Sequence, residues 1–194
     1  LYLDDAHGFG VMGDNGRGTA EHFGLHDQVD VYFGTFAKAF ASIGGVTCGD
    51  PDVISYMAFN SRPDLSSKSL PRAIVETLLA ALPHVESNER RGGLWKIVRM
   101  LQSGLRDLGF DLGNTQAPIT PIHVPGGDTK LAMSAITMLR EEYGVFVTAV
   151  AYPIVPLGTI VFRLVPTFNH TEEDVLRTLA AFKEARARLD WPST

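Results

Sequence analysis

The chain has 194 residues, of which 45% are hydrophobic and 20% charged, a composition typical of globular proteins. Its formal net charge of −5 excludes an electrostatic case for binding nucleic acid or an anionic membrane surface. The single cysteine, Cys48, excludes an intrachain disulfide and favours a reducing, cytoplasmic location. Because Cys48 falls in a predicted strand, we expect it to be a buried core residue.

Strand-like and helix-like segments alternate along the chain, which predicts an α/β protein. The predicted strands cover residues 1–3, 29–33, 45–48, 119–124, 145–149 and 160–165. The predicted helices cover residues 19–24, 50–60, 71–82, 88–108, 129–143 and 171–189. We expect the helix at 88–108 to connect two units, residues 1–91 and residues 92–194.

Local signals mark three of the segment boundaries. Pro71 is predicted to occupy the first position of its helix, which is a favoured place for proline. Residues 60–68 are predicted to form a polar, serine-rich loop. Thr171 and Asp174 resemble a capping box at the start of the last helix.

Residues 145–162 carry no charge over almost the length of a short membrane-spanning helix. This segment contains Pro153, Pro156 and Gly158 and is rich in Val, Ile and Thr. Two strands around a turn therefore explain it better than a spanning helix, and we expect no membrane segment.

Two carboxylates and an imidazole, in the run Asp4-Asp5-Ala6-His7, follow the first predicted strand. Ligands bind at the carboxyl ends of strands in open α/β sheets. Three interpretations stay open: a turn shaped by Asp and Gly, a metal site, or a cofactor site in which a carboxylate holds a pyridinium nitrogen. The glycines that follow allow tight turns or close approach of the backbone, and alone they are weak signals of phosphate binding.

A lone lysine, Lys38, lies in the otherwise apolar run DVYFGTFAKAF. It either extends to water or performs chemistry, since a lysine in a dry pocket has a lowered pKa and can attack a carbonyl carbon. Thr35 lies three residues earlier, where its hydroxyl could contact a phosphate that Lys38 faces.

Taken together, DDAHGFGVMGDNGRG, EHFGL and VDVYFGTFAKAFASIGG closely resemble the α-oxoamine synthase family, and so does YPIVPLGTIVFRLVPTFNHTEEDV. These are pyridoxal-phosphate (PLP) enzymes of the aspartate-aminotransferase fold, fold type I. They include 8-amino-7-oxononanoate synthase, 2-amino-3-ketobutyrate CoA ligase and serine palmitoyltransferase. The resemblance implies that residues 1–91 are the C-terminal part of the PLP-binding large domain. Residues 92–194 would be the small C-terminal α/β domain.

The resemblance also implies a role for each matching residue. Lys38 would form the internal aldimine with PLP and move protons at the substrate α-carbon. Asp4 would pair with the pyridine nitrogen, and His7 would hydrogen-bond the ring 3-oxygen. The remaining matches are Thr35 on the phosphate, Arg163 on the substrate carboxylate, and Ser69 on the phosphate of the neighbouring subunit's cofactor. Ser69 as a helix N-cap, Arg163 as a strand residue facing water, and His170 as a fold-supporting or capping residue are the alternatives.

The implied activity is a biosynthetic acyltransferase that condenses an amino acid with an acyl-CoA, with decarboxylation, to an α-aminoketone. EHFGL and GTFAKAFASIGG resemble serine palmitoyltransferase and oxononanoate-synthase-like members more than aminolevulinate synthases. We expect a homodimer with active sites at the interface and no resident metal. Because such enzymes are about twice this length, the chain is expected to be inactive alone. The alternatives are an aminotransferase of the same fold, a non-catalytic homologue, and a metal-dependent hydrolase built on Asp4, Asp5 and His7.

Overall fold

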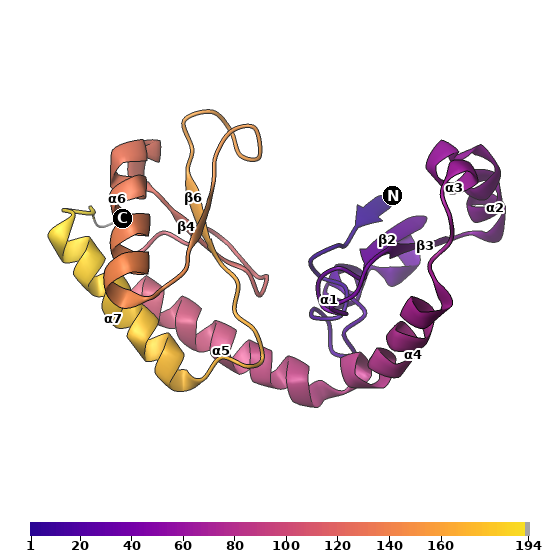
Figure 1. Ribbon diagram of the computed structural model, residues 1–194, viewed down its shortest axis with the longest axis horizontal. Helices are drawn as coiled ribbons and strands as arrows, with labels where there is room; N and C mark the ends of the chain where they lie inside the picture. Colours follow the sequence, from indigo (N-terminus) through magenta and orange to yellow (C-terminus); the bar gives the residue numbers. More distant parts are fainter. Residues whose placement is uncertain (193–194) are drawn as a thin grey trace. The chain divides into compact units, whose positions relative to one another are not determined.

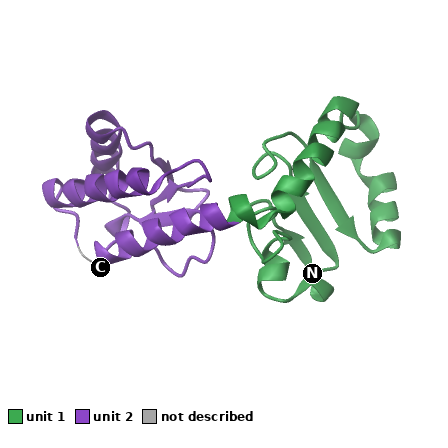
Figure 2. Ribbon diagram, turned by 90° about the horizontal axis from the view of Figure 1, so that it is seen from below, with its two compact units in different colours: residues 1–91 green, residues 92–194 purple. Residues whose placement is uncertain are grey.

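The computed structural model describes residues 1–192, which divide into two compact units coloured separately in Figure 2. Unit 1 comprises Leu1–Arg91 and unit 2 comprises Gly92–Thr194. Residues 193–194, at the end of the second expected domain, lie outside the described residues. Each unit contains a three-stranded sheet with helices, and the α/β class predicted from the sequence is confirmed.

The sheet of unit 1 has the order β1-β2-β3, built from Tyr2–Asp4, Val31–Thr35 and Gly45–Gly49. Strands β1 and β2 are parallel, whereas β3 pairs with β2 in the antiparallel direction. The crossover from β1 to β2 contains α1 (Thr19–His22) and a 3-10 helix (His26–Gln28). Cys48 in β3 is exposed, so the prediction of a buried cysteine is wrong. The reason is that β3 pairs with β2 alone and lies at the edge of the sheet.

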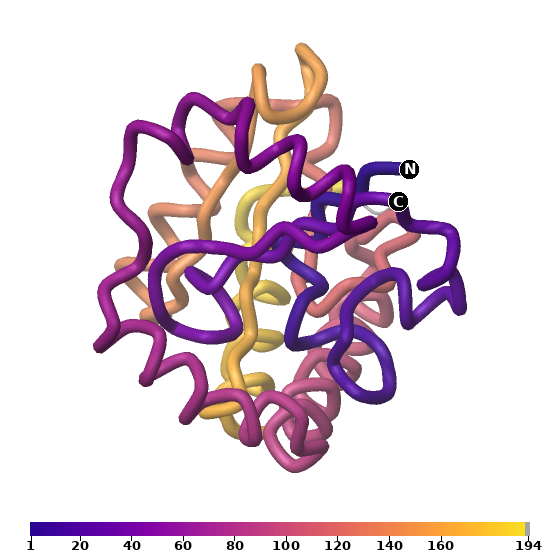
Figure 3. The backbone as a smooth tube through the Cα atoms, turned by 90° about the vertical axis from the view of Figure 1, so that its right-hand side faces the viewer, coloured from indigo at the N-terminus to yellow at the C-terminus, as the bar shows by residue number. Residues whose placement is uncertain are grey.

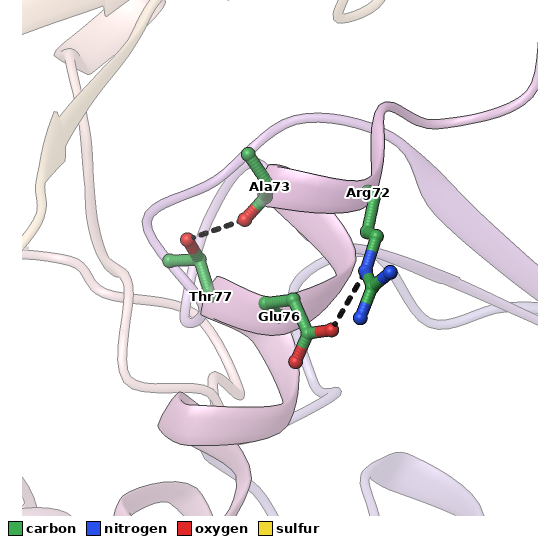
Figure 4. A network of polar contacts seen from close by, with 4 residues as sticks. All are labelled: Arg72, Ala73, Glu76 and Thr77. Carbon is green, nitrogen blue, oxygen red and sulfur yellow. Dashed lines mark hydrogen bonds and ion pairs between the residues drawn. The ribbon is translucent and has the colours of Figure 1, made fainter.

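Three helices follow this sheet, and their course from β3 into α4 can be traced in Figure 3. They are α2 (Pro51–Asn60), α3 (Arg62–Ser66) and α4 (Arg72–Glu86). At the surface of α4, Thr77 donates to the carbonyl of Ala73 and Arg72 forms an exposed ion pair with Glu76 (Figure 4). No residue of these three helices is buried.

Two sequence predictions in this region are wrong. Residues 62–66, expected in a loop, form α3, because Ser61 accepts from the amide of Leu65 and Pro63 fits the first turn of a helix. Pro71 is the N-cap rather than the first helical residue of α4. Its ψ of 142° is not helical, although its carbonyl accepts from the amides of Ile74 and Val75.

Unit 2 contains a fully antiparallel sheet of order β4-β6-β5, built from Thr120–His123, Val161–Leu164 and Thr148–Val150. Three helices gather on one side of this sheet in Figure 1. They are α5 (Asn88–Asp107), which begins in unit 1, α6 (Thr129–Tyr143) and α7 (Glu172–Arg188). A 3-10 helix, Pro125–Gly127, connects β4 to α6.

The core of unit 2 forms between these helices and the sheet. Phe162 and Leu105 are fully buried in it, and Phe110, Phe182 and Trp191 add edge-to-face ring contacts. Helix α7 begins with the expected capping box, since Thr171 and Asp174 bond each other's backbone amides.

The uncharged segment 145–162 forms two strands around a turn, as predicted. Strand β5 begins only at Thr148, three residues later than expected. Val145 instead donates its amide to the carbonyl of Leu139 and completes the end of α6. Within residues 1–192, no helix is long and apolar enough to cross a membrane.

Candidate cofactor and substrate site

The parallel pairing of β1 and β2 brings two groups of candidate residues to one edge of the unit 1 sheet. Asp4, the last residue of β1, is in register with Phe33 of β2. Thr35 ends β2, and Lys38 follows it by three residues. Since parallel strands end at the same edge, Asp4, Thr35 and Lys38 leave the sheet on the side where ligands bind in α/β proteins.

The Asp4–His7 segment forms a tight turn at this edge. Asp4 is exposed, and its Oδ1 accepts from the amide of Ala6 at 3.1 Å. His7 is also exposed. One oxygen of the Asp4 carboxylate thus stabilises the turn, and the group stays accessible to a ligand.

Lys38 lies in the bend between β2 and β3, and its side chain is exposed. Lys38 was expected in a pocket that excludes water, and in this structure its side chain is instead open to solvent. The physical reason is that the flanking Phe36 and Phe40 face inward, where they contact each other and Phe9 at ring-centroid distances of 4.9–6.4 Å. This aromatic cluster packs on the inner side of the loop, and the side chain of Lys38 lies at the surface.

Thr35 is half-buried, and its hydroxyl shapes the same bend. Its Oγ1 donates to the carbonyl of Gly44 at 3.2 Å and accepts from the amide of Ala37 at 3.2 Å. These bonds hold the backbone that presents Lys38. A phosphate at this hydroxyl would have to share it with Gly44.

Ser69 is exposed in the connection between α3 and α4. The alternative that it caps α4 is wrong, because Pro71 is the N-cap and no side chain caps this helix. Ser69 thus has no capping role, and it remains a candidate for a phosphate contact.

Arg163 lies in unit 2, at the centre of β6, where it pairs in register with Pro121 of β4 and Thr148 of β5. Its side chain is half-buried and lines a cavity of about 460 Å³ within this unit. Arg177 and His170 line the same cavity together with Asp174. Arg163 therefore borders a cavity, and its binding of a substrate carboxylate stays a prediction.

His170 supports the turn before α7. Its Nδ1 accepts from the amide of Thr167 at 2.9 Å and lies 2.9 Å from the Thr167 hydroxyl. Of its two alternative roles, this contact matches fold support. The cap of α7 is Thr171, not His170.

Sequence reasoning missed a buried polar cluster beneath the Asp4–His7 turn. The carboxylate of Asp5 is 3% exposed and accepts hydrogen bonds from Thr19 and Tyr32. Because its oxygens are used by these donors, Asp5 is a poor ligand for a metal. No three His, Cys, Asp or Glu side chains among residues 1–192 are grouped to hold one. The metal interpretation of Asp4, Asp5 and His7 is therefore not supported.

The glycine-rich loop after His7 uses its amides internally. Gly10 donates to the carbonyl of Gly16, and Gly18 donates to that of Met12. Glu21 accepts from the amides of Asn15 and Arg17. Although partial burial acts to raise the pKa of Glu21, its hydrogen bonds, first that from the Asn15 side chain, lower it below the ordinary value. These amides are occupied within the loop.

Comparisons with known proteins identify the family and the fold. The family described as aminotransferase class I and II matches residues 1–182. A cysteate-C-fatty acyltransferase of Capnocytophaga ochracea is 43% identical over 98% of this chain and 45% of its own length. An 8-amino-7-oxononanoate synthase of Alkaliphilus oremlandii is 39% identical over 94% of this chain and 46% of its own length.

A solved structure described as serine palmitoyltransferase with a PLP internal aldimine superposes with a TM-score of 0.88. It is 28% identical, over 98% of this chain and 48% of that one. The chain therefore spans about half the length of the relatives that it matches. The resemblance and the fold expected from the sequence are both confirmed.

Proposed function

Because this chain belongs to the aminotransferase class I and II family, we propose that it carries the lysine-bearing half of a PLP-dependent acyltransferase active site. The observation that carries the proposal is the common edge of β1 and β2, which presents Asp4, Thr35 and Lys38 together. Relatives with acyltransferase and synthase activities support the reaction class. The family and the solved relative with bound PLP imply pyridoxal phosphate as the cofactor.

The donor set at this edge fits that cofactor chemically. The Asp4 carboxylate would pair with a protonated pyridine nitrogen, and the His7 imidazole would donate to the ring oxygen. Thr35, with Ser69 from a neighbouring subunit, would bind the phosphate, and the Lys38 amine would bind the aldehyde carbon. When bound, PLP supplies the electron sink that stabilises negative charge at the substrate α-carbon.

The remaining steps belong to the side chains of the chain itself. Arg163 would bind the amino-acid carboxylate with its guanidinium fork and so orient the α-carbon. Lys38 would remove the proton from that carbon. The α-carbon would then bond to the acyl carbon of an acyl-CoA, the CoA thiolate would leave, and CO₂ loss would give an α-aminoketone. The relatives' names point to an amino acid such as cysteate or serine and to a fatty acyl thioester.

The same proposal includes a homodimer whose active sites form at the subunit interface, since Ser69 is exposed and does not serve its own helix. It also includes inactivity of residues 1–194 alone. Lys38 and Asp4 are open to solvent here, and proton abstraction needs a site that excludes water.

Borohydride trapping tests the proposal. The protein at its natural length is incubated with PLP, reduced and digested, and the pyridoxyl adduct is located by mass spectrometry. We expect the label at Lys38, with none in Lys38→Ala, and with Lys130→Ala labelled normally as the matched control. Absence of a label at Lys38 would refute the proposal. Measuring CoA release against keto-acid formation then separates an acyltransferase from an aminotransferase.

A further inference from the structure

Asp5 is the one buried carboxylate among the described residues, at 3% exposure, and it lies between two exposed candidate ligands of the cofactor. Its Oδ2 accepts from the amide of Thr19 and from the hydroxyl of Tyr32, both at 2.7 Å. Its Oδ1 accepts from the Thr19 hydroxyl at 2.5 Å. Three donors compensate the cost of removing this charge from water.

The backbone of Asp5 is fixed as firmly as its side chain. Its amide donates to the carbonyl of Phe33 in β2 at 2.9 Å. Its carbonyl accepts from the amides of Gly8 and Phe9 at 3.1 and 2.9 Å. Every polar group of Asp5 is therefore engaged, and these bonds connect the Asp4–His7 turn to β2 and to the start of α1.

Two glycines leave the space that this arrangement needs. A Cβ atom at Gly8 would lie 2.1 Å from Oδ1 of Asp5, and one at Gly18 would lie 1.9 Å from Oδ2. Both distances are far below a permissible contact. The close packing of backbone around the carboxylate leaves the turn little freedom to rotate.

We propose that Asp5, held by Thr19 and Tyr32, is a positioning residue that fixes the directions of Asp4 and His7 toward the cofactor. This inference rests on the proposed function, in which Asp4 and His7 bind PLP. Adjacent residues of an extended chain point to opposite sides, so locking Asp5 inward holds Asp4 outward. The amides of Gly8 and Phe9, which donate to the Asp5 carbonyl, close the turn that contains His7 and so restrict its backbone.

Tyr32 can donate its hydrogen bond to the Asp5 carboxylate throughout the neutral pH range. Burial, together with the hydrogen bond and charge of Asp5, raises the pKa of the Tyr32 phenol well above its ordinary value. The phenol therefore keeps its proton and remains a donor to Asp5. Its ring also packs edge-on against Phe9 at 6.0 Å, which restricts the hydroxyl to this direction.

The decisive variant is Tyr32→Phe in the protein at its natural length, because it removes one donor and keeps the ring. We expect PLP affinity, measured by absorbance titration, to fall about tenfold, as loss of a charged hydrogen bond allows. We also expect the pH midpoint of the bound cofactor's absorbance band to shift, since that midpoint depends on contacts to the ring nitrogen and oxygen. Tyr2→Phe, an exposed tyrosine of the adjacent β1, is the matched control and should change neither.

A second pair of variants keeps the test independent of folding defects in Tyr32→Phe. Thr19→Val removes the hydroxyl donor with little change of shape, whereas Thr19→Ser keeps it. We expect Thr19→Val to weaken PLP binding and shift the band, and Thr19→Ser to restore both.

Two outcomes would overturn the inference. In the first, Tyr32→Phe and Thr19→Val lower the melting temperature but bind PLP with unchanged affinity and an unchanged band, so that Asp5 only supports the fold. In the second, the unaltered protein neither binds PLP nor labels at Lys38. That result would refute the proposed function, and the inference would fail with it.

Discussion

The two units of this chain differ in how many of their apolar side chains are buried. Unit 2 has a continuous core in which Leu105, Ile122 and Phe162 are fully buried. In the described part of unit 1, the buried apolar side chains are Met12, Ala20 and Phe40. Its helices α2 to α4 instead expose large apolar residues, namely Val53, Tyr56, Phe59, Leu65, Val75, Leu79 and Leu82.

The larger hydrophobic core and the candidate lysine therefore lie in different units. Unit 2 contains a continuous hydrophobic core, and under the proposed function it supplies Arg163. Unit 1 carries Lys38, Asp4 and His7 but lacks a core that could keep them dry. A water-excluded site around Lys38 therefore needs more polypeptide than residues 1–91 supply.

The largest effect should come from the core of unit 2. Phe162→Ala leaves a cavity among residues that cannot fully collapse, and we expect the free energy of unfolding to fall by about 3–5 kcal/mol. Urea denaturation of the whole chain, followed by circular dichroism, measures it. Phe146→Ala, at a side chain 72% exposed in the same unit, should cost far less. Equal losses at the two sites would show that unit 2 has no specific core.

A functional variant sharpens the same comparison. In the protein at its natural length, Arg163→Ala should lower kcat/KM for the amino-acid substrate roughly a hundredfold, mainly through KM. This ratio corresponds to about 2–3 kcal/mol of lost transition-state stabilisation. Borohydride labelling of Lys38 should persist, because the proposed cofactor contacts all belong to unit 1. Arg140→Ala, at an exposed arginine of α6, should leave both unchanged. Loss of the label in Arg163→Ala would contradict this division of roles.

Much of the fold could be predicted because local signals coincide with its boundaries. Helix α6 begins and ends where predicted, since Asp128 caps it and Gly144 closes it with a φ of 67°. Residues 62–66 were expected in a loop because they are mostly polar. Ser61 and Pro63 are nevertheless typical of a helix start, and these residues form α3. The exposure of Cys48 could not be predicted. It depends on which strands lie beside β3, and the local sequence of β3 does not determine this.

The candidate site shows a similar division. Motifs identify Asp4, His7, Lys38 and Arg163 as candidates, and their roles remain predictions. The sequence did not reveal that Asp5 is buried while Asp4 is exposed. The partners of Asp5, Thr19 and Tyr32, lie 14 and 27 residues away and meet it only through the β1-α1-β2 fold. Hydrogen-bond partners at such separations leave no local signal.

A smaller effect is expected at the capping box of α7. Thr171→Ala removes the acceptor for the amide of Asp174 and should lower the free energy of unfolding of unit 2 by about 1 kcal/mol. Thr171→Ser keeps the hydroxyl and should recover most of this loss. Urea denaturation of the whole chain measures both variants. A serine variant as unstable as the alanine variant would show that the methyl group, not the cap, stabilises this helix start.

The smallest effect should come from the exposed ion pair between α6 and α7. Arg188 donates to both oxygens of Glu142, at 2.5 and 3.1 Å, and this hydrogen bond lowers the pKa of Glu142 below its ordinary value. A lowered pKa in the folded state means that the pair stabilises unit 2 above the ordinary glutamate pKa. That contribution disappears as the pH falls through the lowered value. Glu142→Gln should therefore lower the free energy of unfolding slightly at neutral pH and make it depend less on acid pH. Glu184→Gln, the control, should leave both the free energy of unfolding and its pH dependence unchanged. Denaturation at several pH values measures the difference, and parallel pH profiles for Glu142→Gln and the unaltered chain would show that solvent screens this pair completely.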